Sequence, residues 1–196
     1  MLRTQSPTND QRTLAARLVA VDEVRLLDRI AERDLRAFEE LYRIYHPRLT
    51  RFLLNFLRRP QLAEEAVNDT MMVVWRQPER FNGTSKVSTW IFAIGYRVAL
   101  KARSRHDEPM EDHAADQRRS ADADPEERLE QRQVQSLLLE AMAELSPDHR
   151  AVVDLTYFHD IGYREIAKIL DCPVGTVKTR MHHARRHLKT ALAGRL

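Results

Sequence analysis

Apolar residues recur every three or four positions through most of the chain, which is the spacing of one face of an α-helix. The first clear series follows Asp28 and consists of Leu35, Phe38, Leu41, Tyr42 and Tyr45. Pro47 either interrupts this helix or starts the next one, whose apolar face would be Leu49, Phe52, Leu53 and Phe56. No convincing run of alternating polar and apolar residues is present, so the pattern predicts an all-α fold.

Two more helices are expected in the first half of the chain. The third carries Leu62, Ala66, Val73 and Val74. It ends near the segment QPERFNGTS, residues 77–85, where Pro78, Asn82 and Gly83 indicate a loop. The fourth is predicted from Val87 to Ala102, with a bulky apolar face formed by Trp90, Ile91, Ile94 and Val98. A tryptophan on such a face is more often a core residue than a stacking platform.

An acidic segment then interrupts the helical pattern. Residues 106–130 contain ten acids against three arginines, two prolines and very few large apolar side chains. This composition buries too little surface to offset chain entropy, so it predicts a flexible linker. The chain is therefore divided into an N-terminal extension (1–27), an N-terminal helical domain (28–105), an acidic linker (106–133) and a C-terminal helical domain (134–196).

The C-terminal domain begins with the apolar helix VQSLLLEAMAEL. Ser146-Pro147-Asp148 is a helix start signal, with Ser as the N-cap, Pro in the first turn and Asp at the positive end of the dipole. That helix is expected to run to about Phe158, before a turn at residues 160–162. A short helix from Tyr163, a break at residues 171–173 and a long last helix then form a predicted helix-turn-helix.

The last helix is basic on one side and apolar on the other. Residues 172–196 hold six basic residues and no acid. The predicted buried face is Val177, Met181, Ala184, Leu188 and Leu192, and the predicted outward residues are Thr176, Lys178, Thr179, Arg180, His183 and Arg186. Hydroxyls and cations suit phosphate oxygens, and Arg also suits the guanine edge in the major groove. We predict DNA binding by these six residues, in preference to a merely solvated helix face.

Composition excludes several classes of protein and of metal site. The 196 residues are 43% apolar with a net charge of +3, and the single cysteine excludes an internal disulfide framework or a multi-cysteine zinc site. No run of about 18 apolar residues predicts a membrane span, and the N-terminus lacks the apolar centre of a signal peptide. A cytoplasmic protein without membrane insertion is expected.

Three groups of residues are compatible with metal or redox chemistry, but each has a simpler explanation. His182, His183 and His187 have spacings that can chelate zinc, but no nearby carboxylate or thiolate completes a site. Cys172 is a redox-sensor candidate, although a packing role in the turn is favoured. Acids on the third helix suggest a nuclease metal site, without a further cluster to complete it. We therefore expect no catalysis, no cofactor and no bound metal.

Motifs in the C-terminal domain closely resemble the promoter-binding region of bacterial sigma factors of the extracytoplasmic-function (ECF) group. The segment is LSPDHRAVVDLTYFHDIGYREIAKILDCPVGTVKTRMHHARRHL. The matching residues are Tyr163, Glu165, Ile166, Ala167, Cys172, Pro173, Gly175, Thr176, Val177, Lys178, Arg180, Ala184 and Arg185. The resemblance implies that this domain reads the upstream, minus-35 promoter element.

The N-terminal domain resembles the same family in the segments FEELYRIYHPRLTRFL, AEEAVNDTMMVVW and STWIFAIGYRVAL, in the right order. The resemblance implies that Glu64, Glu65 and Asp69 face the clamp helices of core RNA polymerase. It also implies that a loop and the helix after it recognise and melt the minus-ten element, with Asn82, Thr84, Arg97 and Lys101 as DNA contacts. The family usually has Ala-Arg-Asn, with an Asp four residues after the Asn, where this chain has Gly95-Tyr96-Arg97 and Lys101, and the change makes the surface more basic.

The sequence thus predicts a transcription initiation factor that binds core RNA polymerase, directs it to promoters and assists melting. Its expected partners are core polymerase, promoter DNA and an anti-sigma factor or other regulatory protein, and the free chain is expected to be a monomer. One alternative is a stand-alone helix-turn-helix regulator, which leaves the N-terminal motifs unused. Another is a metal-dependent nuclease or recombinase subunit, which predicts metal-dependent cleavage.

Overall fold

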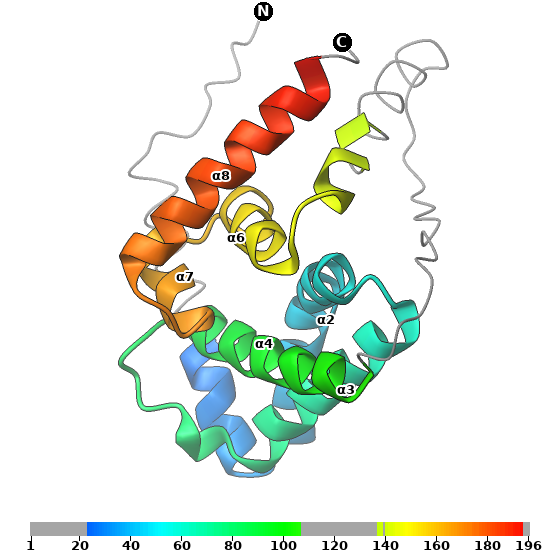
Figure 1. The fold of residues 1–196 in the computed structure, drawn as a ribbon. Coiled ribbons are helices and arrows are strands. Elements are labelled where there is room, and N and C mark those ends of the chain that lie inside the picture. The colour runs from blue at the N-terminus through cyan, green and yellow to red at the C-terminus, as the bar shows by residue number, and fades with distance from the viewer. Residues whose placement is uncertain (1–22, 107–136, 139, 194–196) are drawn as a thin grey trace, which may run out of the picture.

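The computed structural model describes residues 23–106, 137–138 and 140–193, and all regular structure within them is helical (Figure 1). A helix at residues 23–31 comes first. It is followed by α2 (Leu35–Leu57), α3 (Pro60–Arg76), the 3-10 helix η1 (Pro78–Arg80), α4 (Val87–His106), α6 (Pro147–Tyr157), α7 (Tyr163–Ile169) and α8 (Val174–Ala193). The predicted all-α class is confirmed. The predicted linker lies outside the described residues except for His106, as does most of the predicted N-terminal extension.

Helices α2, α3 and α4 form the N-terminal lobe, in which each helix packs against the other two. The largest side chains that meet in its core are fully buried: Tyr45, Phe52, Met71 and Phe92. Asp34 begins α2 as its N-cap, because its carboxylate accepts hydrogen bonds from the backbone N–H groups of Arg36 and Ala37. A glycine lets two of these helices approach closely, since a Cβ added at Gly95 would lie 3.2 Å from Leu49 Cδ2.

The expectation of a helix break at Pro47 is wrong. Helix α2 continues through Pro47 and spans both of the predicted segments. Proline removes one helical N–H, but Pro47 and Arg43, whose carbonyl loses that donor, are both exposed, so water can replace the lost hydrogen bond. The apolar residues on either side of Pro47 lie on one buried face, and their burial outweighs the local cost of the proline.

Helices α6, α7 and α8 form the C-terminal lobe, with α6 packed against both of the others. The predicted start of α6 is confirmed: Ser146 is its N-cap and accepts a hydrogen bond from the backbone N–H of His149, and Pro147 occupies the first turn. A buried arginine joins the segment before α6 to the helix itself. The Arg150 guanidinium donates to the backbone carbonyls of Met142, Ala143 and Leu145, at 2.7–3.1 Å.

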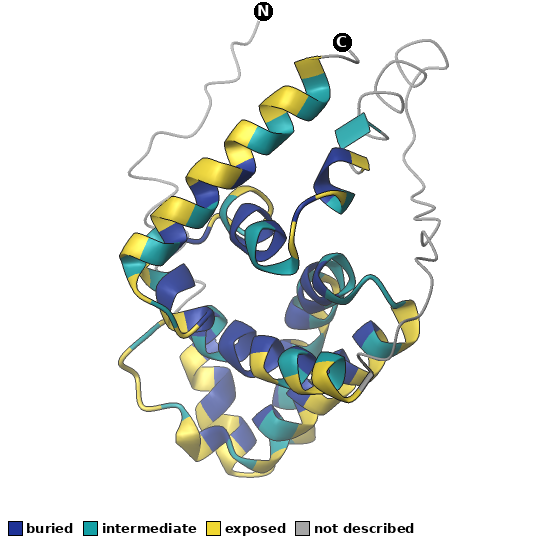
Figure 2. Cartoon of the chain, viewed as in Figure 1, coloured by how far each residue is buried: buried dark blue, intermediate teal, exposed yellow. Residues whose placement is uncertain are grey.

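The two lobes are packed against each other, α2 against α6 and α4 against α7. Their buried apolar residues form one continuous cluster. Figure 2 shows these buried residues on the helix faces that point toward the middle of the molecule, with exposed residues on the outside. The helix-turn-helix of the C-terminal lobe therefore lies beside the N-terminal end of α4.

Candidate nucleic-acid and polymerase interfaces

The helix-turn-helix is built by α7, a four-residue turn and α8. Asp171 in the turn adopts a left-handed backbone conformation, with φ of 50°. The Cys172 N–H donates to the Ala167 carbonyl at 3.0 Å, which closes the end of α7. The predicted inner face of α8 is confirmed in its first half, where Val177, Met181 and Ala184 are buried. This packing fixes which side of α8 faces outward.

Four of the six predicted recognition residues are exposed on α8: Lys178, Thr179, His183 and Arg186. Thr176 is half-buried near the start of the helix. The Thr179 hydroxyl donates to the Gly175 carbonyl at 3.0 Å, one turn earlier in the same helix. The exposed group therefore presents two permanent cations, an imidazole and a hydroxyl on one accessible surface, which suits a polyanion.

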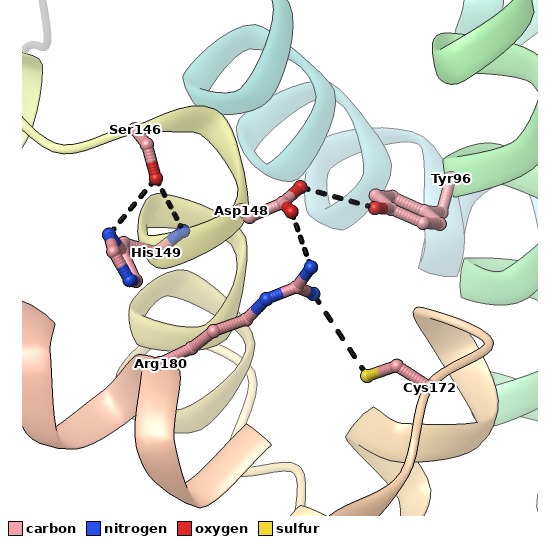
Figure 3. A network of polar contacts seen from close by, with 6 residues as sticks. All are labelled: Tyr96, Ser146, Asp148, His149, Cys172 and Arg180. Carbon is pink, nitrogen blue, oxygen red and sulfur yellow. Dashed lines mark hydrogen bonds and ion pairs between the residues drawn. The ribbon is translucent and has the colours of Figure 1, made fainter. Parts of the chain in front are cut away.

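Arg180 differs from the other predicted recognition residues because its guanidinium is already occupied. It forms an ion pair with Asp148 of α6, and its side chain is only 23% exposed. Its other terminal nitrogen lies 4.0 Å from the Sγ atom of Cys172. Figure 3 shows the side chain of Arg180 reaching away from α8 toward α6 and α4.

Tyr96 of α4 completes this network from the N-terminal lobe. Its hydroxyl donates to Asp148 at 3.5 Å, so one carboxylate receives a donor from each lobe (Figure 3). Burial, together with the negative charge of Asp148, raises the pKa of Tyr96 to about 12. The phenol therefore stays protonated at neutral pH and remains a donor. The Gly95-Tyr96-Arg97 departure from the family pattern thus supplies a buried contact between the lobes.

A groove beside this network is lined by histidines of α6 and α8. Its lining residues include Glu144, His149, His183, Arg186 and His187. Burial, followed by the neighbouring His183 and Arg180, lowers the pKa of His149, so its ring is neutral at pH 7. Within the described ranges, no three His, Cys, Asp or Glu side chains are arranged to hold a metal ion.

The predicted melting loop has an ordered internal structure. The Asn82 side-chain oxygen accepts hydrogen bonds from the Thr84 N–H at 3.1 Å and from the Thr84 hydroxyl at 2.7 Å. Gly83 between them has φ of 71°, in the left-handed region that glycine tolerates best. Asn82 and Thr84 are both exposed. The turn thus holds the Asn82 side-chain oxygen in place, while both residues stay accessible.

Helix α4 follows the loop and presents the other two predicted minus-ten contacts. Arg97 and Lys101 are exposed and lie one turn apart on the same side of the helix. Trp90 is half-buried and packs against the core, with its ring centroid 5.6 Å from that of Phe81. The structure thus agrees with a packing role for Trp90.

The three predicted polymerase-binding acids share the outer face of α3. Glu64, Glu65 and Asp69 are exposed, and the neighbouring Met72 is 43% exposed. The opposite face of α3 is buried, at Ala63, Ala66, Val67, Thr70, Met71 and Val74. An acidic face with an apolar residue beside it is suited to a partner surface that is both basic and apolar.

Sequence reasoning missed the polar residues between the lobes. They are Asn55, Tyr96, Arg150, Asp154 and His159. A signal was present in the sequence for two of them, because Arg150 and Asp154 are one turn apart and flank the apolar run Ala151-Val152-Val153. Charged residues at such positions of a core helix indicate a buried polar partner.

Comparison with known proteins finds two regions of this chain that match family models. Residues 41–108 match the model of Sigma-70 region 2, and residues 135–188 match that of Sigma-70, region 4. The ECF RNA polymerase sigma factor RpoE of Cereibacter sphaeroides is 31% identical over 162 residues, which cover 80% of this chain and 87% of the relative. The chain belongs to the ECF group of RNA polymerase sigma factors.

Other relatives agree with this assignment. The ECF sigma factor SigL of Mycobacterium tuberculosis is 28% identical over 149 residues, or 74% of this chain and 82% of the relative. Among solved structures, CnrH in complex with the cytosolic domain of CnrY has a TM-score of 0.63 at 23% identity, covering 88% of this chain and 98% of CnrH. The sigma factor RpoE of Bartonella quintana, in complex with the anti-sigma factor NepR, has a TM-score of 0.64 at 23% identity, covering 80% and 96%. These two structures support the fold.

The predicted function is confirmed at the level of the family. This ECF sigma factor is a transcription initiation factor that acts with core RNA polymerase at promoters, and the stand-alone regulator is not favoured. None of the helices in the described part of the chain is long and apolar enough to cross a membrane.

Proposed function

We propose that the two lobes divide promoter recognition between them, with α8 reading the minus-35 element and the 82–84 loop with α4 engaging the minus-ten element. The observation that carries this proposal is the contrast between the two sides of α8. Its apolar residues are buried, while Lys178, Thr179, His183 and Arg186 are exposed together. Such a helix, placed second in a helix-turn-helix, fits the major groove.

Lys178→Ala should weaken the use of the minus-35 element. Loss of a direct base contact costs about 1–3 kcal/mol and relaxes specificity at one position, whereas loss of a phosphate contact weakens all sequences alike. The measurement is run-off transcription on templates that carry or lack the upstream element. Lys189→Ala is the matched control, because it removes the same charge from an exposed position three turns further along α8. If the Lys178 variant and wild type transcribe equally across a range of salt concentrations, α8 does not contact the minus-35 element.

At the minus-ten element, melting requires a flipped base to be captured and the strand to be held by its phosphates. The Asn82 amide nitrogen can donate to a base edge, because the Asn82 side-chain oxygen is already held by Thr84. Arg97 and Lys101 supply two exposed cations on the helix that follows. We assign Asn82 and Thr84 to base capture, and Arg97 and Lys101 to the phosphates.

Helix α3 is assigned to core polymerase. Its exposed acids Glu64, Glu65 and Asp69 would orient the lobe by charge complementarity, and Met72 would add apolar contact. We further propose that a regulatory protein of the anti-sigma class binds this factor, as NepR binds the Bartonella RpoE that shares its fold. The free chain is assigned as a cytoplasmic monomer without catalytic activity of its own.

A further inference from the structure

Helix α6 contacts two arginines of α8, one near each end of α6, through groups of different charge. Asp148 in the first turn of α6 forms an ion pair with Arg180. Tyr157, the last residue of α6, accepts a hydrogen bond at its hydroxyl oxygen from Nε of Arg185 at 3.0 Å. The carboxylate offsets the charge of Arg180, whereas the uncharged phenol leaves the full charge of Arg185 in place.

The contact with Tyr157 holds the Arg185 guanidinium by the nitrogen nearest its aliphatic stem. The guanidinium carbon also lies 5.8 Å from the centroid of the Tyr157 ring. No other hydrogen bond and no ion pair holds Arg185 within the described part of the chain. Both residues are exposed, Tyr157 at 58%. The two terminal nitrogens of Arg185 can therefore donate to an anion that approaches from solvent.

Arg185 lies on the same side of α8 as Lys178. The two residues are seven positions apart, and each directly follows a buried residue, Val177 or Ala184. At 1.5 Å per residue, Arg185 is about 10 Å behind Lys178 along the helix axis. A recognition helix reads bases with its N-terminal residues, in a major groove that is roughly 8.5 Å deep. Arg185 is therefore placed at the level of the phosphates, whereas Lys189, about 16 Å behind Lys178, lies beyond them.

From this geometry we infer that Arg185 contacts a backbone phosphate of the minus-35 element, and that Tyr157 is the residue that positions it. This inference rests on the proposed reading of that element by α8. The terminal nitrogens of Arg185 donate to the phosphate oxygens in a charge-assisted contact. Because a free arginine loses much rotamer freedom when it binds, a side chain already held at Nε loses less.

Arg185→Ala tests the phosphate contact in holoenzyme formed from core polymerase and the full-length chain. Binding to a promoter that the wild-type factor uses should weaken about tenfold, and the slope of log affinity against log salt concentration should fall by about 1. Lys189→Ala is the matched control, because it removes an exposed cation from the same side of α8 one turn further along. It should leave the slope unchanged.

Two milder variants test the positioning role of Tyr157. Tyr157→Phe keeps the ring and removes only the hydroxyl, so promoter binding should weaken about threefold, the cost of ordering one long side chain. In an Arg185→Ala chain the same change should have no effect, because both residues act through one contact. Arg185→Lys keeps the charge but lacks the Nε donor, so it should resemble Tyr157→Phe and keep the wild-type salt slope. Circular dichroism checks that each variant is folded.

Three outcomes would overturn the inference. They are Arg185→Ala holoenzyme that binds like wild type at every salt concentration, Tyr157→Phe holoenzyme without any loss, and a Tyr157→Phe loss that is equal with and without Arg185. The Lys178→Ala experiment separates such a failure from failure of the proposed function. If Lys178→Ala weakens use of the upstream element and Arg185→Ala does not, α8 reads that element without this phosphate contact. If neither variant has an effect, α8 does not read the element.

Discussion

Replacing Arg150 by leucine should cost about 3–5 kcal/mol of unfolding free energy, because several buried carbonyls lose their donor and each unsatisfied one costs about 1–3 kcal/mol. Arg150 is 5% exposed. Its guanidinium donates to the carbonyls of Met142, Ala143 and Leu145 within its own lobe, and to that of Asn55 in α2 at 2.8 Å. Leucine fills much of the volume but leaves these buried carbonyls without their donor, and each such acceptor carries a desolvation cost.

Chemical denaturation followed by circular dichroism measures this loss. Arg164→Leu is the matched control, because Arg164 is exposed on α7 and such surface changes usually stay within about 0.5 kcal/mol. The loss of unfolding free energy for Arg150→Lys should lie between those of Arg150→Leu and Arg164→Leu. Lysine keeps a cation but lacks the planar fork that reaches several carbonyls. A loss below about 1 kcal/mol for Arg150→Leu would mean that the segment before α6 does not depend on this arginine.

The double variant Asn82→Ala/Thr84→Ala should bind core polymerase normally but open linear promoter DNA about tenfold less. Unstacking a base costs a few kcal/mol, so the loss of part of the compensating contact shifts the open fraction by this order. The substitution also removes the two hydrogen bonds that order the loop. Permanganate footprinting of unpaired thymines reports the opening directly.

Two controls separate melting from binding in this experiment. Glu79→Ala changes an exposed residue in η1, immediately before the loop, and should open DNA like wild type. A template with a pre-melted bubble should restore transcription by the double variant, because capture of a flipped base is then no longer limiting. Wild-type opening of duplex DNA, or a defect that the bubble does not relieve, would show that the loop is not the melting element.

The parts of the fold that depend on local pattern were predictable from the sequence. Apolar spacing placed α3, α4 and α8, and the Ser146-Pro147-Asp148 signal placed the start of α6. The break expected at Pro47 was wrong because proline propensity is a local quantity, whereas burial along the whole of α2 decided the outcome. Local rules therefore succeeded wherever tertiary packing agreed with them.

The candidate site was predictable in part, for a related reason. The exposure of Lys178, Thr179, His183 and Arg186 follows from helical periodicity once the buried face of α8 is known. The ion pair between Arg180 and Asp148 does not follow from periodicity, because it depends on how α6 lies across α8. The Asn55–Asp154 hydrogen bond joins residues 99 positions apart, and no local pattern records such a pairing.

This chain is expected to confer promoter selectivity on core RNA polymerase. The most direct measurement is transcription from fragmented bacterial genomic DNA by purified core enzyme with and without the full-length chain, followed by sequencing of transcript 5′ ends. New start sites should appear only when both proteins are present, and they should share two sequence elements upstream, near positions −10 and −35. An unchanged set of start sites, or tight sequence-specific DNA binding by the chain without polymerase, would contradict it.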